Sequence, residues 1–99
     1  MENILLIDEA ESATFKTTVV GQKKQITIAV SGTASSATVN FKGRSGGVTA
    51  SLAGIRPDYT TGSSAGMNEV WKFDLSGLTH FTVEVASVSG GNVTVQGRW

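Results

Sequence analysis

The chain has 99 residues, of which 39% are hydrophobic and 16% charged, with 12 glycines and no cysteine. This length predicts one domain spanning residues 1–99, and the lack of cysteine excludes disulfides and thiolate metal sites. Eight basic residues balance eight acidic ones, so no net charge attracts nucleic acid or an anionic membrane surface. We expect neither among its partners.

Residues 1–13 form a candidate N-terminal arm. The apolar run Ile4–Ile7 is too short to distinguish a buried strand from a helical turn, and also too short for an export signal or a membrane span. We therefore expect synthesis in a cytoplasm. Ile4 and Leu5 are candidate contacts with another copy, because terminal elements are often exchanged between subunits.

Three carboxylates follow, on Asp8, Glu9 and Glu11. Clustered carboxylates could bind a divalent cation, or they could belong to a solvated turn. The spacing and the glycine of a calcium-binding loop are missing. We expect no metal and no other cofactor.

Thr14–Val20 reads as a strand, and two hairpins are predicted after it. The first joins Gln25–Val30 to Ala37–Arg44, and the second joins Phe81–Ala86 to the strand that begins at Val93. Both have alternating strands around a turn rich in serine and glycine, and they are separated by about fifty-five positions. Their likeness is either the shared alternation of any two hairpins or a relation by approximate symmetry, with the copies in opposing sheets.

Gly54–Asn68 is the one long segment without a clear period, and segments of this kind are often functional or mobile. It contains four candidate contact residues, Arg56, Asp58, Tyr59 and Met67. Tyrosine offers a flat apolar ring with a hydroxyl, and arginine offers several donors. In the alternative interpretation, Ile55 and Tyr59 only close the end of the domain.

The strand predicted at Glu69–Leu75 places Trp71 on the same face as Phe73 and Leu75, which indicates a core position rather than a ligand platform. His80 is the only histidine, and without cysteine it cannot anchor a typical zinc site.

No set of residues predicts catalysis. Gly62–Gly66 matches the Gly-x-Ser-x-Gly string of a nucleophile elbow, but it lies in a polar loop instead of between a buried strand and a helix. We therefore expect a protein that is not an enzyme.

Period-two alternation together with small-residue turns predicts an all-β fold. The expected architecture is a single-domain antiparallel β-sandwich, jelly-roll or Ig-like, of about seven to eight short strands.

Trp71–Val85 and Val88–Arg98 contain an Asp-Leu-Ser-Gly-Leu turn and a Gly-Gly-Asn-Val-Thr-Val-Gln-Gly segment. These motifs resemble small β-sandwich structural proteins of tailed bacteriophages. The resemblance covers about the last third of the chain. It implies a virion protein, such as a capsid decoration, head-tail or baseplate-associated subunit. Such a subunit would bind copies of itself and other virion proteins, and would be located in the virion.

The alternative function is a small carbohydrate-binding module that stacks sugars on exposed aromatic rings. Tyr59, Trp71 and Trp99 are the candidate platforms. Trp99, at the C-terminus, is the tryptophan more expected to be exposed, and it could equally seal a contact between subunits.

Overall fold

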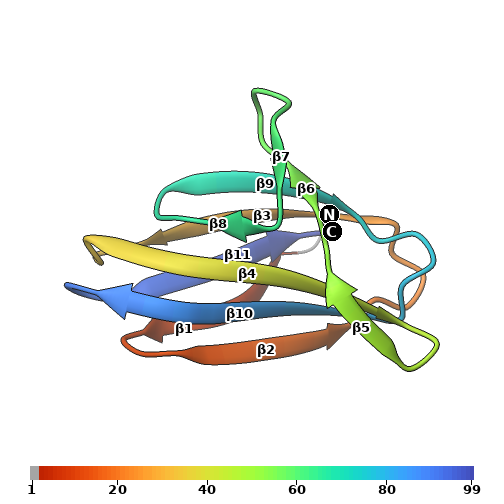
Figure 1. The fold of residues 1–99 in the computed structure, drawn as a ribbon, viewed down its shortest axis with the longest axis horizontal. Helices are drawn as coiled ribbons and strands as arrows, with labels where there is room; N and C mark the ends of the chain where they lie inside the picture. Colours follow the sequence, from red (N-terminus) through yellow and green to blue (C-terminus); the bar gives the residue numbers. More distant parts are fainter. Residues whose placement is uncertain (1–2) are drawn as a thin grey trace.

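The computed structural model describes residues 3–99 and contains two antiparallel sheets packed face to face (Figure 1). The prediction of an all-β sandwich is confirmed. Eight strands have four or more residues: β1 (Asn3–Ala10), β2 (Thr14–Val19), β3 (Gln25–Gly32), β4 (Ser36–Ser45), β5 (Val48–Ser51), β9 (Glu69–Asp74), β10 (His80–Ser89) and β11 (Val93–Arg98). Three two-residue strands lie between β5 and β9: β6 (Gly54–Ile55), β7 (Thr61–Gly62) and β8 (Ser64–Ala65).

The first sheet, sheet A, has the strand order β1-β11-β3-β9-β6-β7. The second, sheet B, has the order β2-β10-β4-β5, and β8 pairs with β4 beside this path. In sequence order the chain passes repeatedly between the sheets, so both are completed only when the C-terminal strands are in place. The part of the chain that the structure describes contains no helix that could cross a membrane.

The core is built by the inward positions of the alternating strands. Trp71 and Phe73 from sheet A face Phe41 and Phe81 from sheet B, and all four side chains are fully buried. The ring centroids of Phe41 and Phe73 lie 4.5 Å apart, and those of Phe73 and Phe81 lie 5.3 Å apart, both with tilted planes. These separations are typical of favourable aromatic packing. The predicted core position of Trp71 is confirmed.

Both predicted hairpins are wrong in their pairing. β10 pairs with β2 and β4 in sheet B, whereas β11 pairs with β1 and β3 in sheet A. The earlier pair, β3 and β4, is divided between the sheets in the same way. Each connection is therefore an arch that crosses from one sheet to the other. Alternation indicates which side chains face a core, but it does not indicate which neighbouring strand provides the hydrogen bonds.

The two arches pack against each other. The backbone N–H groups of Thr33 and Ala34 both donate to the Asn92 carbonyl oxygen, at 3.0 and 2.9 Å, and the Ser35 N–H donates to the Ser89 carbonyl at 2.9 Å. β3 pairs with β11 and β4 pairs with β10, both antiparallel. If the first arch (β3 and β4) is placed on the second (β10 and β11), the β3–β11 pair coincides with the β10–β4 pair of the other sheet. An approximate two-fold axis between the sheets produces this pattern. The pairing favours the symmetric interpretation of the repeat, although each copy contributes one strand to each sheet instead of lying in one sheet.

The apolar run near the N-terminus lies in β1, which pairs with β11 of its own chain. Register shifts on both sides of Ile7 mark bulges, and Leu6 and Ile7 are both buried although they are neighbours. A bulge explains this because an extra residue changes the face to which the next side chain points. Exchange of residues 1–13 between copies stays a prediction, and Met1 and Glu2 lie outside the described residues.

Candidate functional site

The segment predicted as an irregular loop, Gly54–Asn68, contains short strands that join both sheets. β6 pairs with β9 of sheet A through Ile55 and Lys72. β8 pairs with β4 of sheet B through Ala65 and Val39. β6 and β7 pair with each other and form a small hairpin that projects from the body of the sandwich (Figure 1). The segment therefore closes one side of the sandwich and presents a projecting tip, residues 56–60.

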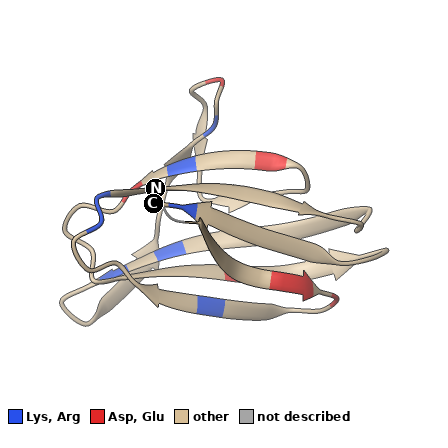
Figure 2. Ribbon diagram, turned by 180° about the vertical axis from the view of Figure 1, so that it is seen from behind, with Lys and Arg blue, Asp and Glu red and all other residues tan. Residues whose placement is uncertain are grey.

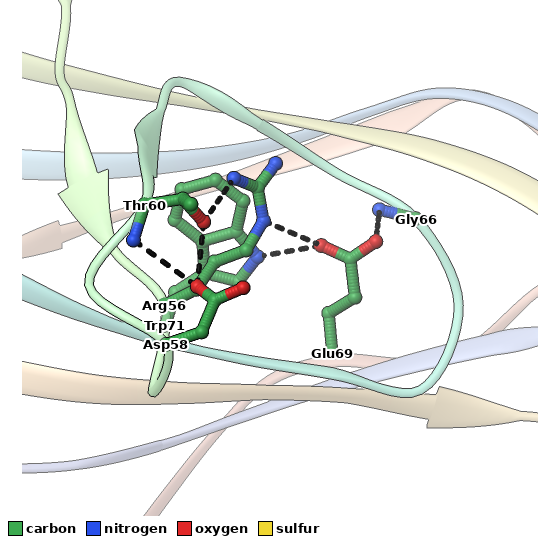
Figure 3. Close-up of polar contacts among 6 residues, drawn as sticks. All are labelled: Arg56, Asp58, Thr60, Gly66, Glu69 and Trp71. Atoms are coloured by element: carbon green, nitrogen blue, oxygen red, sulfur yellow. Dashed lines mark hydrogen bonds and ion pairs between the residues drawn. The ribbon is translucent and has the colours of Figure 1, made fainter.

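Arg56 anchors the base of this tip on the core. Its guanidinium carbon lies 4.2 Å from the centroid of the Trp71 ring, which is a cation–π geometry (Figure 3). Its Nε lies 3.6 Å from Oε1 of Glu69, and the same carboxylate oxygen accepts a hydrogen bond from Trp71 Nε1 at 3.0 Å. Oε2 of Glu69 accepts from the Gly66 N–H at 3.0 Å. One carboxylate thus connects β9 to both ends of the closing segment.

The tip itself is held by a local hydrogen-bond network. Oδ1 of Asp58 accepts from the Thr60 hydroxyl at 2.6 Å and from the Thr60 N–H at 3.1 Å, and Arg56 Nη1 donates to Thr60 Oγ1 at 3.0 Å. The Thr60 hydroxyl, followed by its N–H, stabilises the charged carboxylate and lowers the pKa of Asp58 below its ordinary value. This contribution is complete above the ordinary pKa of aspartate and is lost as the pH falls through the lowered value.

Tyr59 lies at the end of the tip with 87% of its surface exposed and a φ of 68°. A positive φ is uncommon for a residue other than glycine and is strained for a large side chain. The Tyr59 N–H donates to the Arg56 carbonyl at 2.9 Å, so the turn imposes this conformation. The alternative in which Ile55 and Tyr59 close the domain is wrong, because both are exposed. Arg56 covers the core instead.

We expect Arg56→Ala to lower the free energy of unfolding by about 1 kcal/mol, through loss of the cation–π contact and a partly exposed ion pair. The matched control is Lys42→Ala, which removes the Lys42–Glu84 ion pair of similar exposure on sheet B but no ring contact. Its expected effect is below about 0.5 kcal/mol. Urea unfolding measures both, and equal effects would show that stacking on Trp71 contributes nothing.

The hairpin forms one wall of an open groove of about 500 Å³. Its floor is the outer face of β3 and β9, where Gln25 pairs with Asp74 and Thr27 pairs with Lys72. The remaining lining consists of Lys24, Ile55, Arg56, Pro57, Tyr59, Val70, Trp71 and Phe73. We call this surface the Tyr59 groove.

The other predicted contact residues lie elsewhere or are less exposed. Ile4, Met67 and Trp99 are partly buried and pack against the core, so none of them offers a fully open surface. Leu5 is 50% exposed and pairs with Gln96 of β11. Of the predicted set, Arg56, Asp58 and Tyr59 meet in the projecting tip, and Arg56 and Tyr59 also line the Tyr59 groove.

Of the three candidate sugar platforms, Tyr59 alone is open. Trp71 is fully buried and Trp99 is half-buried, which corrects the expectation that Trp99 would be exposed. Packing against the core covers part of the Trp99 ring.

Sequence reasoning missed an apolar surface on β2, the outer strand of sheet B. Phe15 and Val19 are each 68% exposed, with Thr17 between them on the same face. Lys16 pairs with the buried Val83 and so lies on the inner side. Alternation in a strand places Phe15, Thr17 and Val19 on one face, but it could not show that this face points to solvent. We call Phe15 and Val19 the β2 apolar edge.

Among the described residues, the hydroxyl of the serine in the Gly-x-Ser-x-Gly string contacts an asparagine side chain. Ser64 lies in β8, and its hydroxyl donates to Oδ1 of Asn40 at 2.8 Å. The His80 ring contacts Thr79 through Nδ1 at 2.9 Å. Within residues 3–99, no three His, Cys, Asp or Glu side chains are placed to hold a metal ion. Basic and acidic residues are scattered over both sheets (Figure 2).

Comparison with known proteins relates the chain to prophage proteins of Bacillus subtilis (strain 168). It is 38% identical over 82 residues to the SPbeta prophage-derived uncharacterized protein YomS, covering 80% of this chain and 69% of YomS. It is 34% identical over 73 residues to the phage-like element PBSX protein XepA, covering 71% of this chain and only 26% of XepA. The match to XepA therefore spans about a quarter of that protein.

Solved structures agree with these relationships. The crystal structure of YomS superposes with a TM-score of 0.89 at 33% identity, covering 97% of this chain and 88% of that one. The crystal structure described as PBSX exported protein XepA gives a TM-score of 0.91 at 32% identity, covering 97% and 36%. The predicted link to bacteriophages is confirmed. Since the XepA family model matches residues 1–99, the chain belongs to the XepA family, whose relatives YomS and XepA come from prophage or phage-like elements.

Proposed function

We propose that this protein is a non-enzymatic, self-associating structural subunit of a phage-encoded assembly. The observation that carries the proposal is the β2 apolar edge, which has two large apolar side chains that are each 68% exposed. Within residues 3–99, β2 is paired with β10 on one edge and its other edge has no partner strand. Exposed apolar surface and open strand edges favour association with another protein surface. The relatives support the phage context.

The face of β2 that points towards the other sheet restricts how this contact forms. Lys16 lies on that side, next to Leu6 and Ile7 of β1. A charge on the inner side of an edge strand opposes indiscriminate pairing with another sheet. We therefore expect the contact to use the outward side chains of Phe15 and Val19 instead of a sheet that continues from one copy to the next.

The assembly we propose is the phage particle, with this protein as a decoration, head-tail or baseplate-associated subunit that contacts other virion proteins. One solved relative is described as an exported protein of PBSX. That description supports a final location outside the producing cell, and a released virion satisfies it after synthesis in the host cytoplasm.

Sedimentation and native mass spectrometry test self-association. We expect the natural chain to be oligomeric at micromolar concentration, and the double variant Phe15→Lys, Val19→Lys to weaken association by about a hundredfold. This follows because burying one large apolar side chain contributes about 1.5 to 3 kcal/mol, so the lower limit for two such side chains is about 3 kcal/mol, or about a hundredfold. Both side chains point to solvent in the isolated subunit, so the variant should keep its fold.

Val48→Lys is the matched control, because Val48 is also 68% exposed but lies on β5, at the opposite edge of sheet B. It should leave association unchanged. If Val48→Lys dissociates the oligomer and the β2 variant does not, the assignment of the edge is wrong. A natural chain that stays monomeric throughout the micromolar range overturns the proposal of self-association itself.

A further inference from the structure

The Tyr59 groove has a composition that the fold does not explain. Tyr59 is 87% exposed and held at a positive φ by the turn around it, so its ring contributes almost nothing to the core. The turn fixes the backbone at Tyr59, so the chain has less conformational freedom to lose when a ligand stacks on the exposed ring. The groove volume of about 500 Å³ lies within the range of small-ligand sites.

The floor presents polar side chains in a regular array. Strand pairing places Gln25 opposite Asp74 and Thr27 opposite Lys72 on the outer face of β3 and β9. An amide, a carboxylate, a hydroxyl and an ammonium group are thus set about one strand spacing apart in one direction and two residues apart in the other. Such an array of donors and acceptors suits a ligand with several hydroxyl groups, since each hydroxyl both donates and accepts.

The charge of the groove favours an anion. Lys24 and Lys72 both line it, and within residues 3–99 neither forms an ion pair with a carboxylate. Asp74 is the carboxylate that faces them. The Ser76 N–H donates to Asp74 at 2.9 Å, and hydrogen bonds from the Ser76 backbone and then its hydroxyl lower the pKa of Asp74, so it stays ionised at neutral pH. Arg56 is already engaged by Glu69. Two ammonium groups against one carboxylate leave the groove positive.

From these features we infer that the Tyr59 groove binds an acidic saccharide, with a sugar ring stacked on Tyr59, its hydroxyls on the β3–β9 array and its carboxylate or phosphate between Lys24 and Lys72. A peptide fits less well, because β6 and β7 have only two residues each and offer too short an edge for an added strand. This binding is separate from the proposed self-association, which uses the opposite edge of the sandwich.

Amide chemical shifts of the full chain, titrated with defined oligosaccharides, test the inference. Three probes are used: tetragalacturonate, its methyl ester, and a singly phosphorylated maltotetraose. We expect saturable shifts at Lys24, Gln25, Tyr59 and Lys72 with tetragalacturonate, and binding at least about tenfold weaker with the uncharged ester. The phosphorylated probe distinguishes whether a phosphate or a carboxylate is the preferred acidic group.

Variants separate the contributions of the ring and of the charge. Tyr59→Ala and Lys72→Gln should each weaken tetragalacturonate binding by about fivefold to tenfold, and only Lys72→Gln should reduce its dependence on salt. Lys42→Gln, a lysine on the outer face of sheet B, is the matched control and should bind as the natural chain does. The β2 variant of the preceding subsection should also retain binding, so failure of one proposal does not decide the other.

Three results would overturn the inference. One is the absence of saturable shifts with every probe, and another is equal binding of the acid and its methyl ester. The third is that the same amides shift when protein concentration is raised without saccharide, which would show that a second copy occupies the groove.

Discussion

Trp71→Ala is expected to lower the free energy of unfolding by about 3 to 5 kcal/mol, the usual range for removing a large aromatic side chain from a core. Trp71 is fully buried, and its ring centroid lies 5.8 Å from that of Phe41 and 6.2 Å from that of Phe73. The substitution also removes the indole N–H that donates to Glu69 and the ring below Arg56. A domain of this size has about 5 to 15 kcal/mol in total, so the loss takes much of its stability.

Urea unfolding followed by circular dichroism measures this effect without relying on tryptophan emission. Tyr59→Ala is the control, because that side chain is 87% exposed and its removal should change stability by no more than about 0.5 kcal/mol. If the two variants are equally stable, the assignment of Trp71 to the core and Tyr59 to the surface is contradicted. The same Tyr59→Ala protein is then available for the saccharide titration with its stability known.

Gly32→Ala should destabilise the protein by about 3 to 4 kcal/mol, through backbone strain together with overpacking. Gly32 has a φ of 130°, a conformation that side chains rarely adopt. An added Cβ would also collide with the Asn92 carbonyl oxygen, and it would lie 3.0 Å from the Val93 Cα. Both are backbone atoms of the facing arch and cannot rotate away.

Gly46→Ala is the control that measures the backbone strain of a positive φ without any collision of the added Cβ. Gly46 has a φ of 59°, and no atom lies within 4 Å of the position that its Cβ would occupy. Only the conformational cost remains, which is about 1 to 2 kcal/mol. Thermal or urea unfolding of the two variants should therefore differ by about 2 kcal/mol. A Gly32→Ala protein as stable as Gly46→Ala would mean that the two arches are not in contact.

For the two arches, the sequence predicted that the chain reverses but not which strands pair. Serine and glycine at positions 89–91 correctly indicated a reversal of the chain between two alternating strands. A tight hairpin and an arch between sheets need the same kind of residue, because both require positive φ and small side chains. The choice depends on which strands complete the hydrogen bonds, and these partners are distant in sequence: β3 for β11, and β4 for β10.

In the candidate site, too, the sequence predicted the local features but not the contacts between distant residues. Arg56, Asp58 and Tyr59 were predictable because polar and aromatic residues stand together in a segment without a period. The sequence contains no signal that connects them with Lys24, Gln25 or Lys72, which are brought to the same groove by the pairing of β3, β9 and β6. Phe15 and Val19 were missed as surface residues for a similar reason, since their exposure follows from the position of β2 at the end of sheet B.

The sequence by itself determined the all-β class, six of the eight strands with four or more residues, and the apolar face of each of those six, because period-two alternation is a local property of an extended backbone. Only the tertiary structure decided which sheet each strand joins, which apolar side chains stay in solvent, and which polar residues meet in the groove. Those outcomes depend on hydrogen bonds and packing between residues far apart in the chain, and a local pattern leaves several such pairings open.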